Sequence, residues 1–189
     1  MQELLAQIAE RADDPDRATD EGHGITGALG QPILYVANPP ATPSELTAAS
    51  QDLPGPLPEL LTRLYGTVGN GGYGPGYGLL PLPASSIRRG HTTVTEQLLE
   101  LRDGHPDWPP SVVPVVSWGC GIYSCLDLSS PEAPVLRYDH YVEPETIREY
   151  FRGGYPECHL FPESPSFERW LTGWVKGEPL FEVQPELGG

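Results

Sequence analysis

The sequence predicts a single domain in which amphipathic helices flank a short antiparallel sheet. Apolar residues recur at helical spacing over residues 57–68 and 167–175. Between these segments, three β-prone runs at 112–118, 122–128 and 135–138 are separated by glycine-rich or Ser-Pro turns, which is typical of a three-stranded antiparallel meander. The chain of 189 residues has the length of one domain with one core.

Helix start and stop signals support the helices of the N-terminal half. Residues 2–12 have the spacing of a short amphipathic helix. Thr42 is followed by proline and, three residues later, by glutamate, which is a capping box for a helix over 43–51. We expect the helix over 57–68 to end in a left-handed cap at Gly69.

Further elements complete the predicted order. A second capping box starts a helix over 93–103, a proline begins a short helix over 143–152, and an aromatic-rich helix over 164–177 closes the domain. A short strand is expected over 32–37. Residues 78–82 are expected to form a strand or the edge of one.

The stretch from residue 65 to residue 82 contains seven glycines among eighteen residues. This density excludes a regular helix or strand, and because apolar residues in the stretch can pack, we expect an ordered loop. Gly69 to Gly74 has the spacing of a dinucleotide-binding motif. However, it follows a helix, runs into Pro75 and lacks an acidic residue about 20 positions later. The stretch therefore indicates a structural turn and no nucleotide cofactor.

The composition is strongly acidic. Eleven Lys and Arg residues stand against 26 Asp and Glu residues, for a formal net charge of −15. This charge repels a phosphate backbone, so we expect no nucleic-acid partner. It accelerates encounter with a basic protein, whereas the alternative is that the acidity only confers solubility.

The sequence also bears on the cellular compartment. The first residues lack the basic start, apolar core and cleavage site of an export signal, and no stretch has the length of a membrane span. An odd number of cysteines, three, is typical of a reducing interior. We therefore expect a cytoplasmic protein without a membrane partner.

The cysteines are candidates both as metal ligands and as nucleophiles. Cys120, Cys125, Cys158 and His159 are the candidate zinc ligands, but Cys120 and Cys125 are too widely spaced along a predicted hairpin for a typical zinc site. Cys120 lies in a turn between two glycines and is the best-placed candidate nucleophile. We expect no metal and no cofactor, with a cysteine-dependent hydrolase as a remaining alternative.

Aromatic residues of the glycine stretch and of the meander suit protein recognition, with core packing as the alternative for each. Two aspartates at strand ends join this set. The candidate partner-binding residues are Tyr73, Tyr77, Trp118, Tyr123, Asp127, Tyr138 and Asp139.

Four motifs occur in order between residues 41 and 176. An apolar helix leads into an Asn-Gly-Gly loop, a glycine turn precedes a strand ending in Leu-Asp, an apolar-Tyr-Asp-His strand follows, and a Ser-Phe helix closes the series. The residues are Asn70, Gly71, Gly72, Gly119, Gly121, Leu126, Asp127, Leu136, Tyr138, Asp139, His140, Ser166 and Phe167. This order resembles the SUKH superfamily, which includes fungal cell-wall-synthesis regulators and bacterial immunity proteins. The hairpin departs from many members by carrying Trp118 and Cys120.

The resemblance implies an α+β domain with a mixed, mainly antiparallel sheet over residues 41–181. It leaves residues 1–40 unexplained, which we interpret as a helix and a mobile extension, and residues 182–189 as an acidic tail that frays. Asn70, Gly71, Gly72, Gly119 and Gly121 are expected to shape turns.

The resemblance also implies a non-enzymatic protein. The first hypothesis is an immunity protein that neutralises a bacterial toxin domain with a basic surface, such as a nuclease. The second is an intracellular scaffold or regulator of the cell-wall-synthesis type. The hydrolase is the third. Neither the toxin nor the oligomeric state follows from the sequence.

Overall fold

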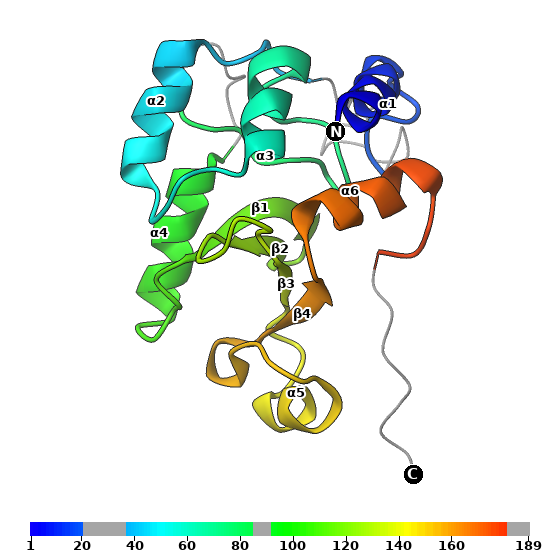
Figure 1. The fold of residues 1–189 in the computed structure, drawn as a ribbon. Coiled ribbons are helices and arrows are strands. Elements are labelled where there is room, and N and C mark those ends of the chain that lie inside the picture. Colours follow the sequence, from blue (N-terminus) through cyan, green and yellow to red (C-terminus); the bar gives the residue numbers. More distant parts are fainter. Residues whose placement is uncertain (21–36, 85–91, 181–189) are drawn as a thin grey trace, which may run out of the picture.

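Four antiparallel strands form an open sheet with helices packed around it (Figure 1). The computed structural model describes residues 1–20, 37–84 and 92–180. The α+β class is confirmed. The α-helices are α1 Gln2–Asp13, α2 Pro43–Asp52, α3 Glu59–Arg63, α4 Val94–Gly104, α5 Pro144–Tyr150 and α6 Phe167–Lys176. The strands are β1 Val112–Gly119, β2 Ile122–Asp127, β3 Val135–Tyr138 and β4 Leu160–Ser164.

The predicted meander corresponds to β1, β2 and β3, which pair in sequence order. The fourth strand, β4, adds to β3 and was not predicted. Its sequence, LFPES, contains a proline and a glutamate, which interrupt a β-prone pattern. Because β4 is an edge strand, Pro162 is tolerated there without breaking the centre of the sheet.

The helix predicted over residues 57–68 is divided. Its first part is α3, and a π-helical turn, η2 Leu64–Val68, follows directly. The expected left-handed cap at Gly69 is wrong, because this residue is extended, with φ 170°. Glycine is required there for space, since a Cβ atom on Gly69 would lie 2.7 Å from the carbonyl oxygen of Asn38.

Capping explains where the other helices begin. In both α2 and α4 the N-cap threonine and the glutamate three residues later form the expected reciprocal capping box. Helix α6 is capped by Ser166, two residues after the predicted start, and by Gly177, which is left-handed with φ 69°. The strand expected over 32–37 lies almost entirely outside the described residues, and so does the tail from residue 182.

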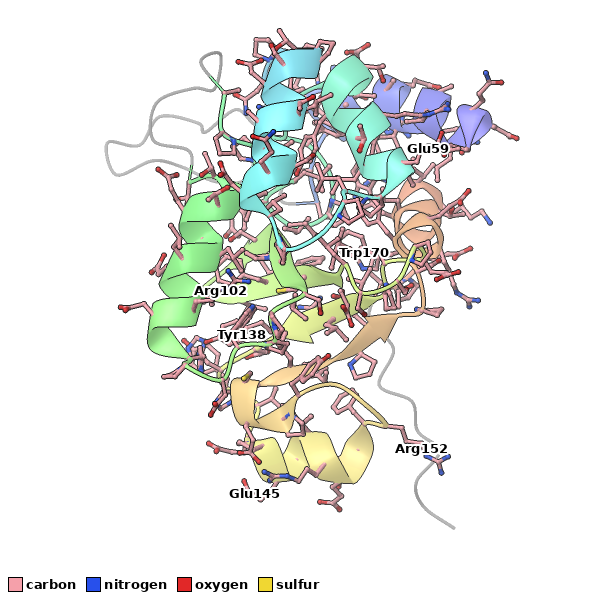
Figure 2. The ribbon with its side chains drawn as sticks, turned by 60° about the vertical axis from the view of Figure 1, so that its left-hand side comes forward. Glu59, Arg102, Tyr138, Glu145, Arg152 and Trp170 are labelled. Carbon is pink, nitrogen blue, oxygen red and sulfur yellow. The ribbon has the colours of Figure 1, made fainter. Side chains whose placement is uncertain are left out.

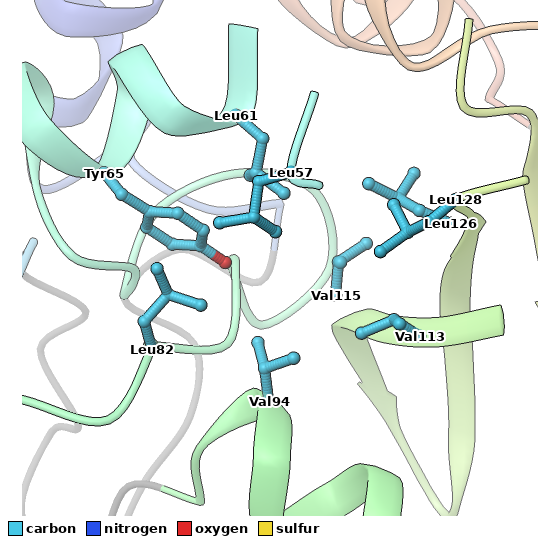
Figure 3. Close-up of a pocket in the computed structure, with 9 residues that line it drawn as sticks. All are labelled: Leu57, Leu61, Tyr65, Leu82, Val94, Val113, Val115, Leu126 and Leu128. Atoms are coloured by element: carbon cyan, nitrogen blue, oxygen red, sulfur yellow. The ribbon is translucent and has the colours of Figure 1, made fainter. Parts of the chain in front are cut away.

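Apolar side chains of most of the helices and of all four strands form one buried core. Figure 3 shows Tyr65 and apolar side chains from α3, from the start of α4 and from β1 and β2 lining one junction, which leaves no room for a water molecule. Helix α1 packs on α6, and its residues Leu4, Ile8 and Ala12 are buried in the same core. Helix α5 lies at the opposite end of the molecule, next to β4 (Figure 1).

The glycine loop, residues 65–82, runs along the outer edge of β1. The amide of Tyr77 donates to the Ser117 carbonyl at 2.9 Å, and the amide of Leu80 donates to the Val115 carbonyl at 2.8 Å. Leu79 forms an isolated antiparallel bridge with Val116. The strand expected over residues 78–82 is therefore not formed, since Leu79 makes only an isolated bridge. The hydrogen bonds of Tyr77 and Leu80 cover part of the edge of β1 instead.

Candidate partner-binding surface

The asparagine that follows the helical segment anchors the glycine loop. Asn70 is fully buried, and its side chain exchanges two hydrogen bonds with the backbone of Leu82, at 2.8 and 3.0 Å. Gly71 and Gly72 are left-handed, with φ 75° and 85°. This arrangement shapes the turn and leaves no polar group of Asn70 for a ligand.

The two tyrosines of the loop have different environments. Tyr73 is fully buried, and burial raises its pKa well above the ordinary value, so this side chain is not available to a partner. Tyr77 is partly exposed and packs against the β1–β2 hairpin, where a Cβ atom on Gly119 would lie 2.7 Å from its ring. Gly119 and Gly121 are both left-handed in that hairpin, with φ 79° and 74°.

Tyr123 and Tyr138 lie side by side on one face of the sheet. Their rings stack with centroids 6.2 Å apart, and the Tyr138 hydroxyl lies 2.8 Å from Nε2 of His105. Figure 2 shows Tyr138 inside the molecule beside α4. Burial, followed by the charges of His159 and His140, lowers the pKa of His105. Only the partly exposed Tyr123 of this pair presents area to the surface.

Trp118 lies on the other face of the sheet, within a network of polar groups. Its indole donates to Oγ of Ser124 at 2.8 Å, and Ser124 donates to Glu163 at 2.6 Å. Arg137 stacks on the Trp118 ring at 4.6 Å and forms an ion pair with Glu163 at 2.9 Å. Since the Glu163 side chain has no exposed area, this network fixes the position of Arg137.

Two hollows meet at Arg137. The first, which we call the Arg137 hollow, has a volume of about 320 Å³ and is lined by Arg11, Asp20, Trp118, Arg137, Trp174, Gly177, Glu178 and Leu180. The second, which we call the α5 groove, has a volume of about 430 Å³ and is lined by Arg137, Asp139, Val142, Thr146, Tyr150, Phe151 and Phe161. Arg137 lines both hollows, so the two form one continuous candidate surface.

The wall of the Arg137 hollow repeats the pairing of arginine with tryptophan. Arg11 stacks on Trp174 at 4.1 Å and donates to the carbonyl of that residue at 2.7 Å. Asp20 accepts hydrogen bonds from the Trp174 indole and from the Gly76 amide, at 2.8 and 3.0 Å. The described part of the N-terminal extension is thereby held against the glycine loop.

The two candidate aspartates are separated. Asp139 lines the α5 groove and accepts from the Tyr141 amide at 3.0 Å. Asp127 lies at the far end of β2, where it accepts from the Ser129 amide at 2.9 Å. Burial opposes its ionisation, but hydrogen bonds from Ser129 and Ser111 hold the pKa of Asp127 below its ordinary value. Of the candidate set, the structure thus places only Trp118 and Asp139 in the walls of the two hollows.

The cysteines have different exposures. Burial raises the pKa of both Cys125 and Cys158, which makes these thiols poor nucleophiles at neutral pH. Cys120 is exposed in the hairpin. Among the described residues, no group of three His, Cys, Asp or Glu side chains is arranged to hold a metal ion, and no helix is both long and apolar enough for a membrane crossing.

Comparison with known families decides the classification. The model of the SMI1 / KNR4 family (SUKH-1) matches residues 40–173, which is more than half of the chain. This protein belongs to the SUKH-1 family. The resemblance inferred from the four motifs is confirmed, and the SUKH-1 match covers the glycine loop, the whole sheet and most of α6. Searches of curated proteins and of solved structures found no match.

Sequence reasoning missed Arg137 and the groove beside α5. Arg137 lies within a β-prone run, and alternation along the strand directs its side chain to the face of the sheet opposite that of Tyr138. Its partner Glu163 lies 26 residues later, on a strand that the sequence did not predict. One signal was present. An arginine inside a short strand that is otherwise apolar or aromatic needs a partner, because a charge is costly to bury alone.

Proposed function

We propose that this SUKH-1 protein is a non-enzymatic binding module that neutralises a bacterial toxin domain with a basic surface. The observation that carries the proposal is that the Arg137 hollow and the α5 groove meet at Arg137. Tryptophans line the Arg137 hollow, and phenylalanines and a tyrosine line the α5 groove. Aromatic and arginine side chains held in place by packing are typical anchors of protein interfaces. Family membership supports a protein-binding role of immunity or regulatory type.

The charge of the chain supports a basic partner. A net charge of −15 steers a basic domain toward the surface and repels nucleic acid and other acidic partners. An association rate that depends on such steering falls as the salt concentration rises. The proposed complex should therefore form markedly faster at low than at high ionic strength.

Growth rescue tests the proposal. The product of the neighbouring gene is expressed in bacteria with and without this protein, and we expect it to act as a toxin that arrests growth alone and to permit growth when both are present. Purified proteins should then form a complex detectable by size-exclusion chromatography. If the toxin still arrests growth and no complex forms, the immunity role is wrong. A growth defect on deleting the gene in cells that lack the toxin would instead favour the scaffold or regulatory role.

A further inference from the structure

We propose that the α5 groove receives a bulky apolar side chain of a partner protein, flanked on that partner by lysine or arginine. The inference deepens the proposed function and rests on it in one respect, the basic character of the partner. It assigns the anchoring contact to a specific groove and gives the anchoring segment a chemistry.

The shape of the α5 groove suits an apolar anchor. Its volume of about 430 Å³ falls within the range of roughly 300–1,000 Å³ that is typical of ligand-binding clefts. Phe161 is 1% exposed, and its ring stacks on Phe151 with centroids 4.5 Å apart, so the two rings form a fixed apolar floor. Tyr150, which is 45% exposed, and Thr146 supply the open side.

The exposed aromatic at the rim is the kind of residue that gains from a partner. Thr146 and Tyr150 are four residues apart on α5 and therefore lie on the same helix face, which is the face toward the groove. Ile147, on another face of α5, is fully buried and holds the helix against the domain. A side chain inserted between α5 and the floor would remove the exposed part of Tyr150 from water without requiring the helix to move.

The carboxylates beside the α5 groove favour basic residues next to the apolar anchor of the partner. Residues 139–163 contain six carboxylates and two arginines. Asp139 is in the groove wall, and Glu143 and Glu149 lie three residues before and after Thr146, beside the groove-facing side of α5.

The two arginines of this segment, together with Arg137 in the groove wall, do not reverse that charge. Arg148 forms ion pairs with Glu145 and Glu157, and Arg137 forms its ion pair with Glu163. Arg152 points away from the domain in Figure 2. The rim of the groove is therefore acidic and fits lysine or arginine beside the apolar anchor, whereas it repels an acidic peptide or an anionic lipid.

A peptide selection tests the inference on the full-length chain. The probe is a phage-displayed library of random short peptides, selected against the wild-type protein. Selected peptides are synthesised and titrated against wild type, against Thr146→Arg, which places a long cationic side chain in the groove, and against Thr47→Arg. Thr47 is an exposed threonine on α2, so it provides the same charge change away from the groove.

We expect the enriched peptides to combine a large apolar residue with neighbouring lysine or arginine. They should bind Thr146→Arg at least about tenfold more weakly than they bind Thr47→Arg or wild type, which corresponds to about 1.4 kcal/mol. Three results would overturn the inference: no enrichment, enrichment without a basic bias, or equal binding to the two variants. Because Thr146 is exposed, both variants should keep the wild-type Tm, which confirms that they fold.

The same reagents separate this inference from the proposed function. If the protein rescues growth but peptides that combine apolar and basic residues are not enriched, the proposed role of the α5 groove is wrong and the immunity role stands. Enrichment of peptides that need the groove, with no rescue from the neighbouring toxin, removes the immunity role and leaves the groove as a site for another basic protein.

Discussion

The glycine loop and the α5 end of the molecule, residues 135–163, differ in where their polar groups are satisfied. In the glycine loop, buried side chains such as Asn70 and Tyr65 bond to the backbone of the loop itself, and backbone amides bond to β1. In the α5 end, most charged side chains lie at the surface and an open groove remains. The glycine loop, which has a conspicuous sequence motif, thus has a structural role. The candidate binding surface at the α5 end has no comparable motif.

The largest effect is expected from removing the anchor of the glycine loop. Asn70→Ala leaves both the amide and the carbonyl of Leu82 without the hydrogen bonds that they form now. An unpaired buried group costs about 1–3 kcal/mol, so we expect a loss of about 3–5 kcal/mol in the free energy of unfolding, measured by urea titration. A loss below about 1 kcal/mol would show that the loop is held by other means.

The next effect tests the need for glycine itself. A Cβ atom on Gly71 would lie 2.5 Å from the Leu79 carbonyl oxygen, and the residue is left-handed. We expect Gly71→Ala to lower the free energy of unfolding by about 2–3 kcal/mol. Gly104→Ala is the matched control, because the added Cβ meets no atom within 4 Å at the end of α4. That variant should be neutral or slightly stabilised. Equal stability of the two variants would contradict a structural role for Gly71.

A smaller effect separates the two buried tyrosines of the loop. The Tyr65 hydroxyl donates to the Leu80 carbonyl at 2.7 Å, whereas the Tyr73 hydroxyl has no hydrogen-bond partner among the described residues. Tyr65→Phe should therefore cost about 1–2 kcal/mol, and Tyr73→Phe should be neutral or stabilising. Thermal unfolding of both variants checks the difference. A larger loss for Tyr73→Phe would indicate that its hydroxyl has a partner after all.

Local signals predicted most of the fold. The capping boxes at Thr42 and Thr93 locate two helix starts because the bonds involved span only three residues. The π-helical turn after Arg63 was missed because it depends on tertiary contacts, among them the Ala41 amide that donates to the Tyr65 carbonyl. No pattern within the helix indicates that distant donor.

The candidate surface was less predictable for the same reason. Residue type alone indicated Trp118 and Asp139 as candidates. Arg137 lies between them and is held by an ion pair with Glu163. Glu163 is on β4, which the sequence did not predict as a strand because it contains a proline and a glutamate. Tyr73 and Tyr138 were candidates because they are aromatic, yet both are buried. Residue type suggests which side chains suit recognition. Burial, which depends on the whole chain, decides which of them reach the surface.

The smallest predicted effect is a pH dependence at His105, the residue that follows α4 and contacts Tyr138 and His159 of the α5 end. Burial and the nearby His159 and His140 lower the pKa of His105 below the ordinary value of about 6.5. The unfolded chain therefore binds more protons between the lowered pKa and about 6.5, so the free energy of unfolding rises with pH in that window. This contribution is fully present above about pH 6.5 and is lost on acidification through the pKa of folded His105.

Urea titrations between about pH 5 and pH 7 measure this dependence. His105→Gln should reduce the loss of stability on acidification, even though its stability at neutral pH also falls because the hydrogen bond to Tyr138 changes. Tyr65→Phe is the control from the glycine loop. Burial raises the pKa of Tyr65, so this side chain stays neutral over the whole range and the pH slope of that variant should match wild type. If His105→Gln keeps the wild-type slope as well, the pH dependence does not originate at His105.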